Sequence, residues 1–228
     1  MSSVKKLREE GKIKEALQVV LELEQGKDLS LKELLSYKLV KADLLRLLWN
    51  YLDAIEIAKE IFQEFQKQGD LVSSFDALLI QAYCYTMMAN LSKSEDTIKQ
   101  SEVFLQNIKQ TLVIDLRERE SQFLRIKANS VSFKGEVSQS LKLTKKAYEL
   151  AKDIGNKGLI CASLNNIADK YYQMQEYDKA IRYAKQALKV NDPSILGFLL
   201  GTLIEIYLSK GNIKKAKVYL DHLHDYSD

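Results

Sequence analysis

Small residues recur along this chain at a period that a single compact core does not produce. One column of them stands at Ala16, Ala54, Ser94, Ser140, Ala180 and Ala216, in steps of 38, 40, 46, 40 and 36 residues. A second column lies twelve residues before the last five members of the first, at Ala42, Ala82, Ala128, Ala168 and Ile204. Self-similarity at a period of this length is typical of repeat architectures. The pattern indicates one structural unit that is copied along the chain.

The fixed offset of twelve residues fits a hairpin of two antiparallel helices. Small side chains at a helix crossing let the two axes approach to about 8 Å, closer than bulky side chains allow. A turn with a breaker such as Gly11, Gly135 or Gly211 lies in several copies between the two helices. The chain holds one proline and nine glycines in 228 residues, so breakers are otherwise scarce. We therefore predict an all-α fold.

The columns resemble the tetratricopeptide repeat. The best copy spans 161–193, and one residue is inserted before its final proline. Its residues at the family's characteristic positions are Leu164, Ile167, Ala168, Tyr171, Tyr177, Ala180, Ala187 and Pro193. Other copies depart from the pattern, since Lys41, Gln81 and Lys127 stand where the family usually has leucine. The long repeats are similar to those of kinesin light chains and of regulatory arrays in bacterial transcription activators.

This resemblance implies a right-handed superhelical solenoid of antiparallel helix hairpins. We expect one array over residues 1–228. Its predicted parts are a partial hairpin at 4–26 and complete hairpins at 35–69, 75–110, 116–154, 158–191 and 195–224. Gly197 and Gly201 form a GxxxG pattern, which we expect to let two hairpin helices approach closely.

The sequence offers little for catalysis, and we expect neither an enzyme nor a bound cofactor. It lacks the P-loop, GxGxxG, GxSxG and HExxH motifs. His222 and His224 are the only imidazoles, and side chains two apart on a helix diverge, so no metal site is expected. Cys84 and Cys161 lie far apart and are predicted to be free thiols in a reducing cytoplasm.

Charge and hydropathy also narrow the partners. The formal net charge is +3, with 34 basic and 31 acidic residues interleaved, and basic clusters lie near both ends of the chain. Without interleaved aromatic residues or a recognition helix, these clusters do not favour nucleic acid. The most apolar stretch, 195–208, is shorter than the roughly 20 residues that span a bilayer. We expect a cytoplasmic protein with no membrane association.

The family resemblance implies a concave groove lined by the first helix of each hairpin. Carried over to this sequence, the groove centres on polar and aromatic residues of the third to fifth hairpins. They are Tyr83, Arg125, Asn129, Asn165, Asn166, Asp169 and Tyr172. Asparagine amides both donate and accept hydrogen bonds, so this cluster suits a peptide read through its main chain. An alternative interpretation treats Asn165 and Asn166 as ordinary polar residues of a solvated face.

The family's chaperone-tail site requires two cations on the last of three helices. Phe198 and Thr202 stand in those places here, which disfavours that site. The favoured function is a protein-protein interaction scaffold that binds a peptide or helix in the groove. A second hypothesis is a signal-sensing regulatory module that belongs to, or works with, an ATPase or a transcription regulator. Self-association through the C-terminal helix is a third possibility, with Ile213, Tyr219, Leu220 and Leu223 as its contact residues.

Overall fold

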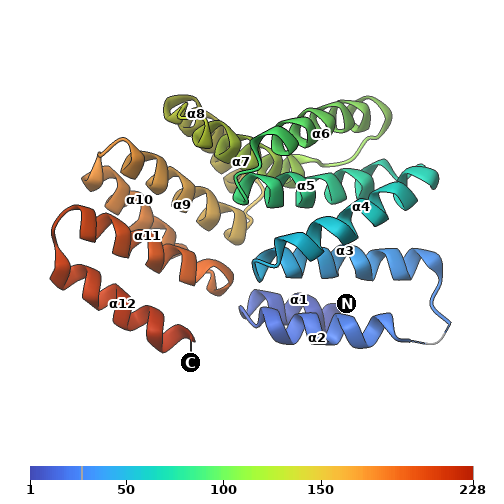
Figure 1. Cartoon of the computed structure of the whole chain (residues 1–228), viewed down its shortest axis with the longest axis horizontal. Helices are drawn as coiled ribbons and strands as arrows, with labels where there is room; N and C mark the ends of the chain where they lie inside the picture. Colours follow the sequence, from blue (N-terminus) through green and yellow to red (C-terminus); the bar gives the residue numbers. More distant parts are fainter. Residues whose placement is uncertain (27, 228) are drawn as a thin grey trace. The chain divides into compact units, whose positions relative to one another are not determined.

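A computed structural model describes residues 1–26 and 28–227 (Figure 1). Within these residues the regular structure is helical, and it consists of twelve α-helices in six consecutive hairpins. The hairpins are α1 (Ser2–Glu9) with α2 (Ile13–Glu24), α3 (Leu31–Leu47) with α4 (Tyr51–Lys67), α5 (Leu71–Met87) with α6 (Leu91–Thr111), α7 (Arg117–Phe133) with α8 (Val137–Asp153), α9 (Lys157–Gln173) with α10 (Tyr177–Val190), and α11 (Leu196–Ser209) with α12 (Ile213–Ser227). A short 3₁₀ turn, η1 (Pro193–Ile195), leads into α11. The all-α fold predicted from the repeat is confirmed.

Each hairpin turns through one residue in the left-handed region. Glycine fills this position in three hairpins, at Gly11, Gly135 and Gly211, and other residues fill it in the other three, at Trp49, Ala89 and Gln175. The next backbone N–H then donates to a carbonyl in the last turn of the first helix, as from Asn90 to Tyr85 at 3.0 Å and from Glu176 to Tyr171 at 2.9 Å. This bond satisfies a carbonyl that the helix end leaves without an intrahelical partner.

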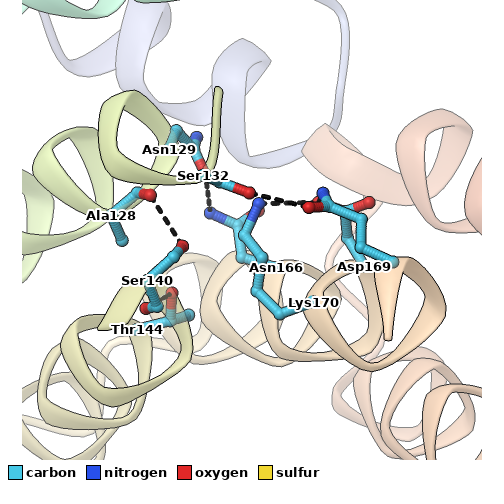
Figure 2. A network of polar contacts seen from close by, with 9 residues as sticks. Ala128, Asn129, Ser132, Ser140, Thr144, Asn166, Asp169 and Lys170 are labelled. Carbon is cyan, nitrogen blue, oxygen red and sulfur yellow. Dashed lines mark hydrogen bonds and ion pairs between the residues drawn. The ribbon is translucent and has the colours of Figure 1, made fainter. Parts of the chain in front are cut away.

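The two columns of small residues lie in the crossings of these hairpins. All six members of the first column are at most 3% exposed, and four of the second are fully buried. Where serine replaces alanine, its hydroxyl is bonded. Ser140 Oγ donates to the carbonyl of Ala128 at 2.6 Å (Figure 2). Ser94 Oγ lies 2.7 Å from Thr86 Oγ1. Ile204 is only half-buried, and Leu203 beside it is the fully buried residue of that turn.

By its internal contacts the chain forms two compact units, Met1–Arg119 and Glu120–Asp228, which we call the first and the second unit. The first contains α1 to α6 and the start of α7, and the second contains the rest. Each has its own apolar clusters, for example around Leu35, Ile61 and Phe65 in the first and around Ile167, Tyr171 and Ile206 in the second.

The most apolar helix, α11, is 14 residues long. A helix needs about 20 apolar residues to span a bilayer. No described helix meets the length and apolarity that a membrane span requires.

The GxxxG expectation is wrong at Gly201, because an added Cβ would meet no atom within 4 Å there. Within the described residues, no neighbouring helix therefore approaches that glycine closely.

Candidate functional site

The first helices of the second unit hold six of the seven residues predicted to line the groove. Arg125 and Asn129 lie on α7, and Asn165, Asn166, Asp169 and Tyr172 lie on α9. All six are half-buried. The structure joins the two helices through an amide pair, in which Asn166 Nδ2 donates to Asn129 Oδ1 at 3.3 Å (Figure 2).

A second chain of polar contacts links the same two helices through Asp169. Ser132 Oγ donates to Gln173 Oε1 at 2.8 Å, and Gln173 Nε2 donates to Asp169 Oδ2 at 2.9 Å. Lys170 Nζ lies 2.8 Å from the same oxygen, although the lysine side chain is only 4% exposed. These bonds hold the Asp169 carboxylate in one orientation on the α9 surface (Figure 2).

Lys170 was not among the residues predicted from the sequence. Adjacent residues on a helix normally point in different directions, so its place beside Asp169 gave no signal of an ion pair. A buried lysine is expensive unless a carboxylate compensates its charge. Lys170 and Asp169 therefore form an ion pair, and the Asp169 carboxylate has its counter-ion on the same helix.

Asn165 and Arg125 complete the predicted polar cluster. Asn165 Oδ1 is buried and has no hydrogen-bond donor within the part of the chain that the structure describes. A buried acceptor without a donor costs free energy, so a donor from a ligand would be favoured there. Arg125 is close enough to Cys161 for its charge to oppose the effect of burial, which nevertheless raises the pKa of that thiol to about 12.

Tyr172 and Tyr83 were predicted to bracket the cluster, and they lie in different units. The Tyr172 hydroxyl lies 3.0 Å from Ser209 Oγ and so links α9 to α11. Tyr83 belongs to α5 in the first unit, where the Arg46 guanidinium lies 4.5 Å from its ring centroid. The Tyr51 ring meets Tyr83 edge-on at 6.3 Å. Tyr83 is thus part of a local cluster in the first unit.

An ionic cluster in the first unit contains pairs that the sequence did not predict. Asp43 on α3 accepts from Arg46 Nε at 2.8 Å and Nη2 at 2.6 Å, and its other oxygen pairs with Arg8 on α1. Burial alone would raise the pKa of Asp43, but the two guanidinium groups outweigh it and lower that pKa.

On the neighbouring α5, Asp76 forms a bidentate pair with Arg119, with two bonds of 2.7 Å. Here burial is the larger effect, and it raises the pKa of Asp76 above its ordinary value. The partners in the Arg8–Asp43 and Asp76–Arg119 pairs lie more than thirty positions apart in the sequence, so a local motif could not reveal these two pairs.

The described residues contain no group of three histidine, cysteine or carboxylate side chains that could hold a metal ion. Cys84 and Cys161 are both buried. Burial raises the pKa of each thiol to about 12, which keeps it protonated near neutral pH. These two groups are poor candidates for a nucleophile. The polar side chains that α7 and α9 bring together, Asn129, Asn166 and Asp169, offer hydrogen-bond donors and acceptors instead.

Comparison with known families decides what the repeat is. Residues 161–193 match the model of the tetratricopeptide repeat. The fold is tetratricopeptide-like. The match covers α10 and all of α9 except its first four residues, and this is the hairpin whose residues carry the sequence resemblance most fully. No curated protein sequence matches the chain.

Solved structures support the same fold over nearly the whole tetratricopeptide-like chain. A Rap protein complexed with competence and sporulation factor is 17% identical with a TM-score of 0.69, and the match covers 99% of this chain and 75% of that one. PlcR of Bacillus thuringiensis, in complex with the peptide PapR7 and DNA, is 15% identical with a TM-score of 0.67, over 93% of this chain and 71% of that one. A signal-transduction ATPase of Pyrococcus horikoshii with a tetratricopeptide repeat sensor is 20% identical with a TM-score of 0.65, over 92% of this chain but only 31% of the ATPase.

Proposed function

We propose that this chain is a protein-interaction module that binds a peptide or a short helix. The ligand would lie on the face of α7 and α9 that carries Asn129, Asn166 and Asp169. The observation that carries the proposal is the amide pair of Asn129 and Asn166. That bond uses one donor of Asn166 and the oxygen of Asn129. Asn129 Nδ2 and Asn166 Oδ1 take no part in that bond, and neither atom has a hydrogen-bond partner among the described residues. A donor and an acceptor side by side match the alternating N–H and C=O groups of a peptide main chain.

Two neighbouring features support the same face. Asn165 offers a buried carbonyl oxygen without a donor, which a ligand N–H could satisfy. The Asp169 carboxylate is fixed by Lys170 and Gln173, so little conformational entropy is lost when a ligand meets it. Pre-organised polar groups of this kind supply orientation and specificity in a binding site.

The similar structures are consistent with a peptide ligand. The Rap protein is complexed with competence and sporulation factor, and PlcR is complexed with the peptide PapR7. Both are less than 25% identical to this chain, so they establish its fold and not its ligand. The peptide assignment rests on the amide pair and has to be tested on this chain.

The test replaces Asn129 and Asn165 together by alanine and measures capture of the partners that the wild-type chain retains from lysate. We expect capture to fall at least about tenfold, since two hydrogen bonds of roughly 1 kcal/mol each are lost. The matched control replaces Gln139 and Gln186, two exposed residues of α8 and α10, and should capture as the wild type does. Equal capture by both double variants would contradict a binding site on this face of α7 and α9.

A second candidate function is a signal-sensing module that works with an ATPase or a transcription regulator. It is favoured by the match to the Pyrococcus horikoshii ATPase, in which a tetratricopeptide repeat serves as sensor and of which this chain covers 31%. The discriminating measurement is the mass of the native protein in cell lysate. A mass well above that of the 228-residue chain, with an ATPase or DNA-binding partner in the same fraction, would support this function. A chain that migrates alone would count against it.

A further inference from the structure

The exposed faces of α8 and α10 carry a marked excess of positive charge. These are the second helices of two consecutive hairpins in the second unit. Their exposed cations are Lys142, Lys145, Lys146 and Lys152 on α8 and Lys179, Arg182, Lys185 and Lys189 on α10. Their exposed anions are Glu149, Asp153 and Asp178. We call this surface the cationic face.

Most of the nearby anions are already paired. Glu149 pairs with Lys152 at 3.2 Å. Asp178 pairs with Lys210, which follows the last residue of α11 in the next hairpin. Lys179 is paired with Glu176. Six cations are left without an ion-pair partner among the described residues, namely Lys142, Lys145, Lys146, Arg182, Lys185 and Lys189.

One cation from each of the two helices lies beside the same ring. Lys145 of α8 and Lys179 of α10 lie 5.6 and 5.4 Å from the centroid of the same ring, that of Tyr171. Along each helix, residues three or four apart are about 5–6 Å apart at Cβ. This spacing along one helix is shorter than the Debye length of about 8 Å at physiological salt, so the fields of neighbouring cations on the same helix add.

The excess is specific to the second unit. Lys142 and Arg182 stand two residues after the small-residue column on their helices. At the same place on the three second helices of the first unit are exposed residues without positive charge, namely Gln18, Glu56 and Asp96. The cationic face is therefore not a general property of solvated second helices in this repeat.

We propose that the cationic face docks an acidic polypeptide segment, a run of Asp and Glu side chains in a partner protein. The exposed residues of α8 and α10 are all polar, so the face lacks the apolar side chains that enter a membrane interface. It also lacks exposed aromatic rings on which single-stranded bases would stack. Unpaired cations on an ordered helical face match carboxylates in sign, and such complementarity raises the association rate and selects the partner.

The test measures binding of a fluorescently labelled oligo-glutamate peptide to the full chain by anisotropy at low salt. Replacing Lys142 and Arg182 together by glutamate should raise the Kd about tenfold or more, and added salt should weaken binding of the wild type. The control replaces Lys32 and Lys99, two exposed lysines of the first unit, by glutamate and so changes the net charge by the same amount. This control should change the Kd by less than about twofold. Circular dichroism establishes that both variants are folded.

Two results would overturn the proposal. An equal loss of binding in both double variants would mean that only the total charge matters. Tighter binding of duplex DNA, single-stranded DNA or phosphatidylserine vesicles than of the oligo-glutamate peptide would mean that the face serves another class of partner. Competition among these probes on the wild-type chain distinguishes the cases.

Discussion

Gly201 lies inside α11, where a side chain would meet no neighbouring atom within 4 Å. Glycine in a helix interior costs about 0.5–1 kcal/mol relative to alanine, because its backbone loses more freedom on folding. We expect Gly201→Ala to raise the free energy of unfolding by about that amount, measured by urea denaturation. Destabilisation would show instead that this glycine is needed for a close contact, as the GxxxG pattern had suggested.

The two buried thiols predict an alkaline limit to stability. The pKa of Cys84 and that of Cys161 are raised to about 12, with burial as the main cause, whereas a free cysteine titrates near 8.5. The unfolded chain therefore loses thiol protons first as the pH rises. We expect the free energy of unfolding to fall between about pH 8.5 and 12 through these groups, and the fall to be smaller in Cys84→Ala.

The same thiols should react slowly with Ellman's reagent in the native chain at pH 8. Denaturation should make both react at once, because the thiolate is the nucleophile and unfolding restores its ordinary pKa. Rapid labelling of either thiol in the native chain would contradict the burial that the structure shows.

At the level of helix pairs, Ser140 shows how a hairpin accepts a polar residue at its crossing. Its hydroxyl donates to the Ala128 carbonyl of the facing helix, and Thr144 Oγ1 donates to the Ser140 carbonyl at 2.9 Å (Figure 2). Ser140→Ala removes the bond between the helices but restores the column's commonest residue. We expect a loss of about 1 kcal/mol in the free energy of unfolding. Ser138→Ala, at an exposed position of the same helix, is the control and should change little.

The Asp43 cluster ties α1 to α3 in the first unit and predicts acid sensitivity. Arg46 and Arg8 lower the pKa of the Asp43 carboxyl in the folded chain. The stability that Asp43 contributes is therefore complete above its unfolded pKa, near 3.9, and is lost as the pH falls through its folded pKa. At pH 7 we expect Asp43→Asn to cost on the order of 3 kcal/mol, because two guanidinium groups lose their counter-ion. The difference between variant and wild type should shrink below about pH 4. A constant difference down to pH 2 would rule out the ionised carboxylate as its source.

The hairpins could be predicted from the sequence because the crossing limits side-chain size at two positions in most of the repeats. Ala128 and Ser140, twelve residues apart, meet that limit, and any larger residue would separate the helices. The candidate site could be predicted only as a face. Asn129 and Asn166 were placed on it by the repeat, but their bond depends on the rotamers of both side chains, which no spacing rule specifies.

Long-range ion pairs were the least predictable part. Arg8 and Asp43 lie 35 residues apart and on different hairpins, and Lys170 is buried in a register that usually carries no charge. Which of several nearby charges pair is decided by side-chain reach and burial. Those quantities exist only in the folded chain.

At the scale of the whole molecule, the net charge of +3 is divided unevenly between the two units. The range of the first unit holds 17 basic and 19 acidic residues, and that of the second holds 17 and 12. The surplus gathers on α8 and α10, whereas the proposed peptide site uses α7 and α9. The two proposals thus concern different helix faces of one unit. Variants of Asn129 should leave oligo-glutamate binding unchanged, and variants of Lys142 should leave peptide capture unchanged.

The last helix leaves half or more of three apolar side chains exposed. Ile213, Val218 and Leu220 on α12 are 71%, 51% and 53% exposed, and Leu208 at the end of α11 is 53% exposed. Exposed apolar side chains favour association, since burial yields about 25 cal/mol per Å². We expect light scattering to show a mass that rises above that of the monomer with protein concentration. Replacing Ile213 and Leu220 by lysine should keep the chain monomeric, whereas Val103→Lys, at an equally exposed position of α6, should not. A wild-type chain that stays monomeric at high concentration would remove self-association through α12, and its apolar face would then be open to a different partner.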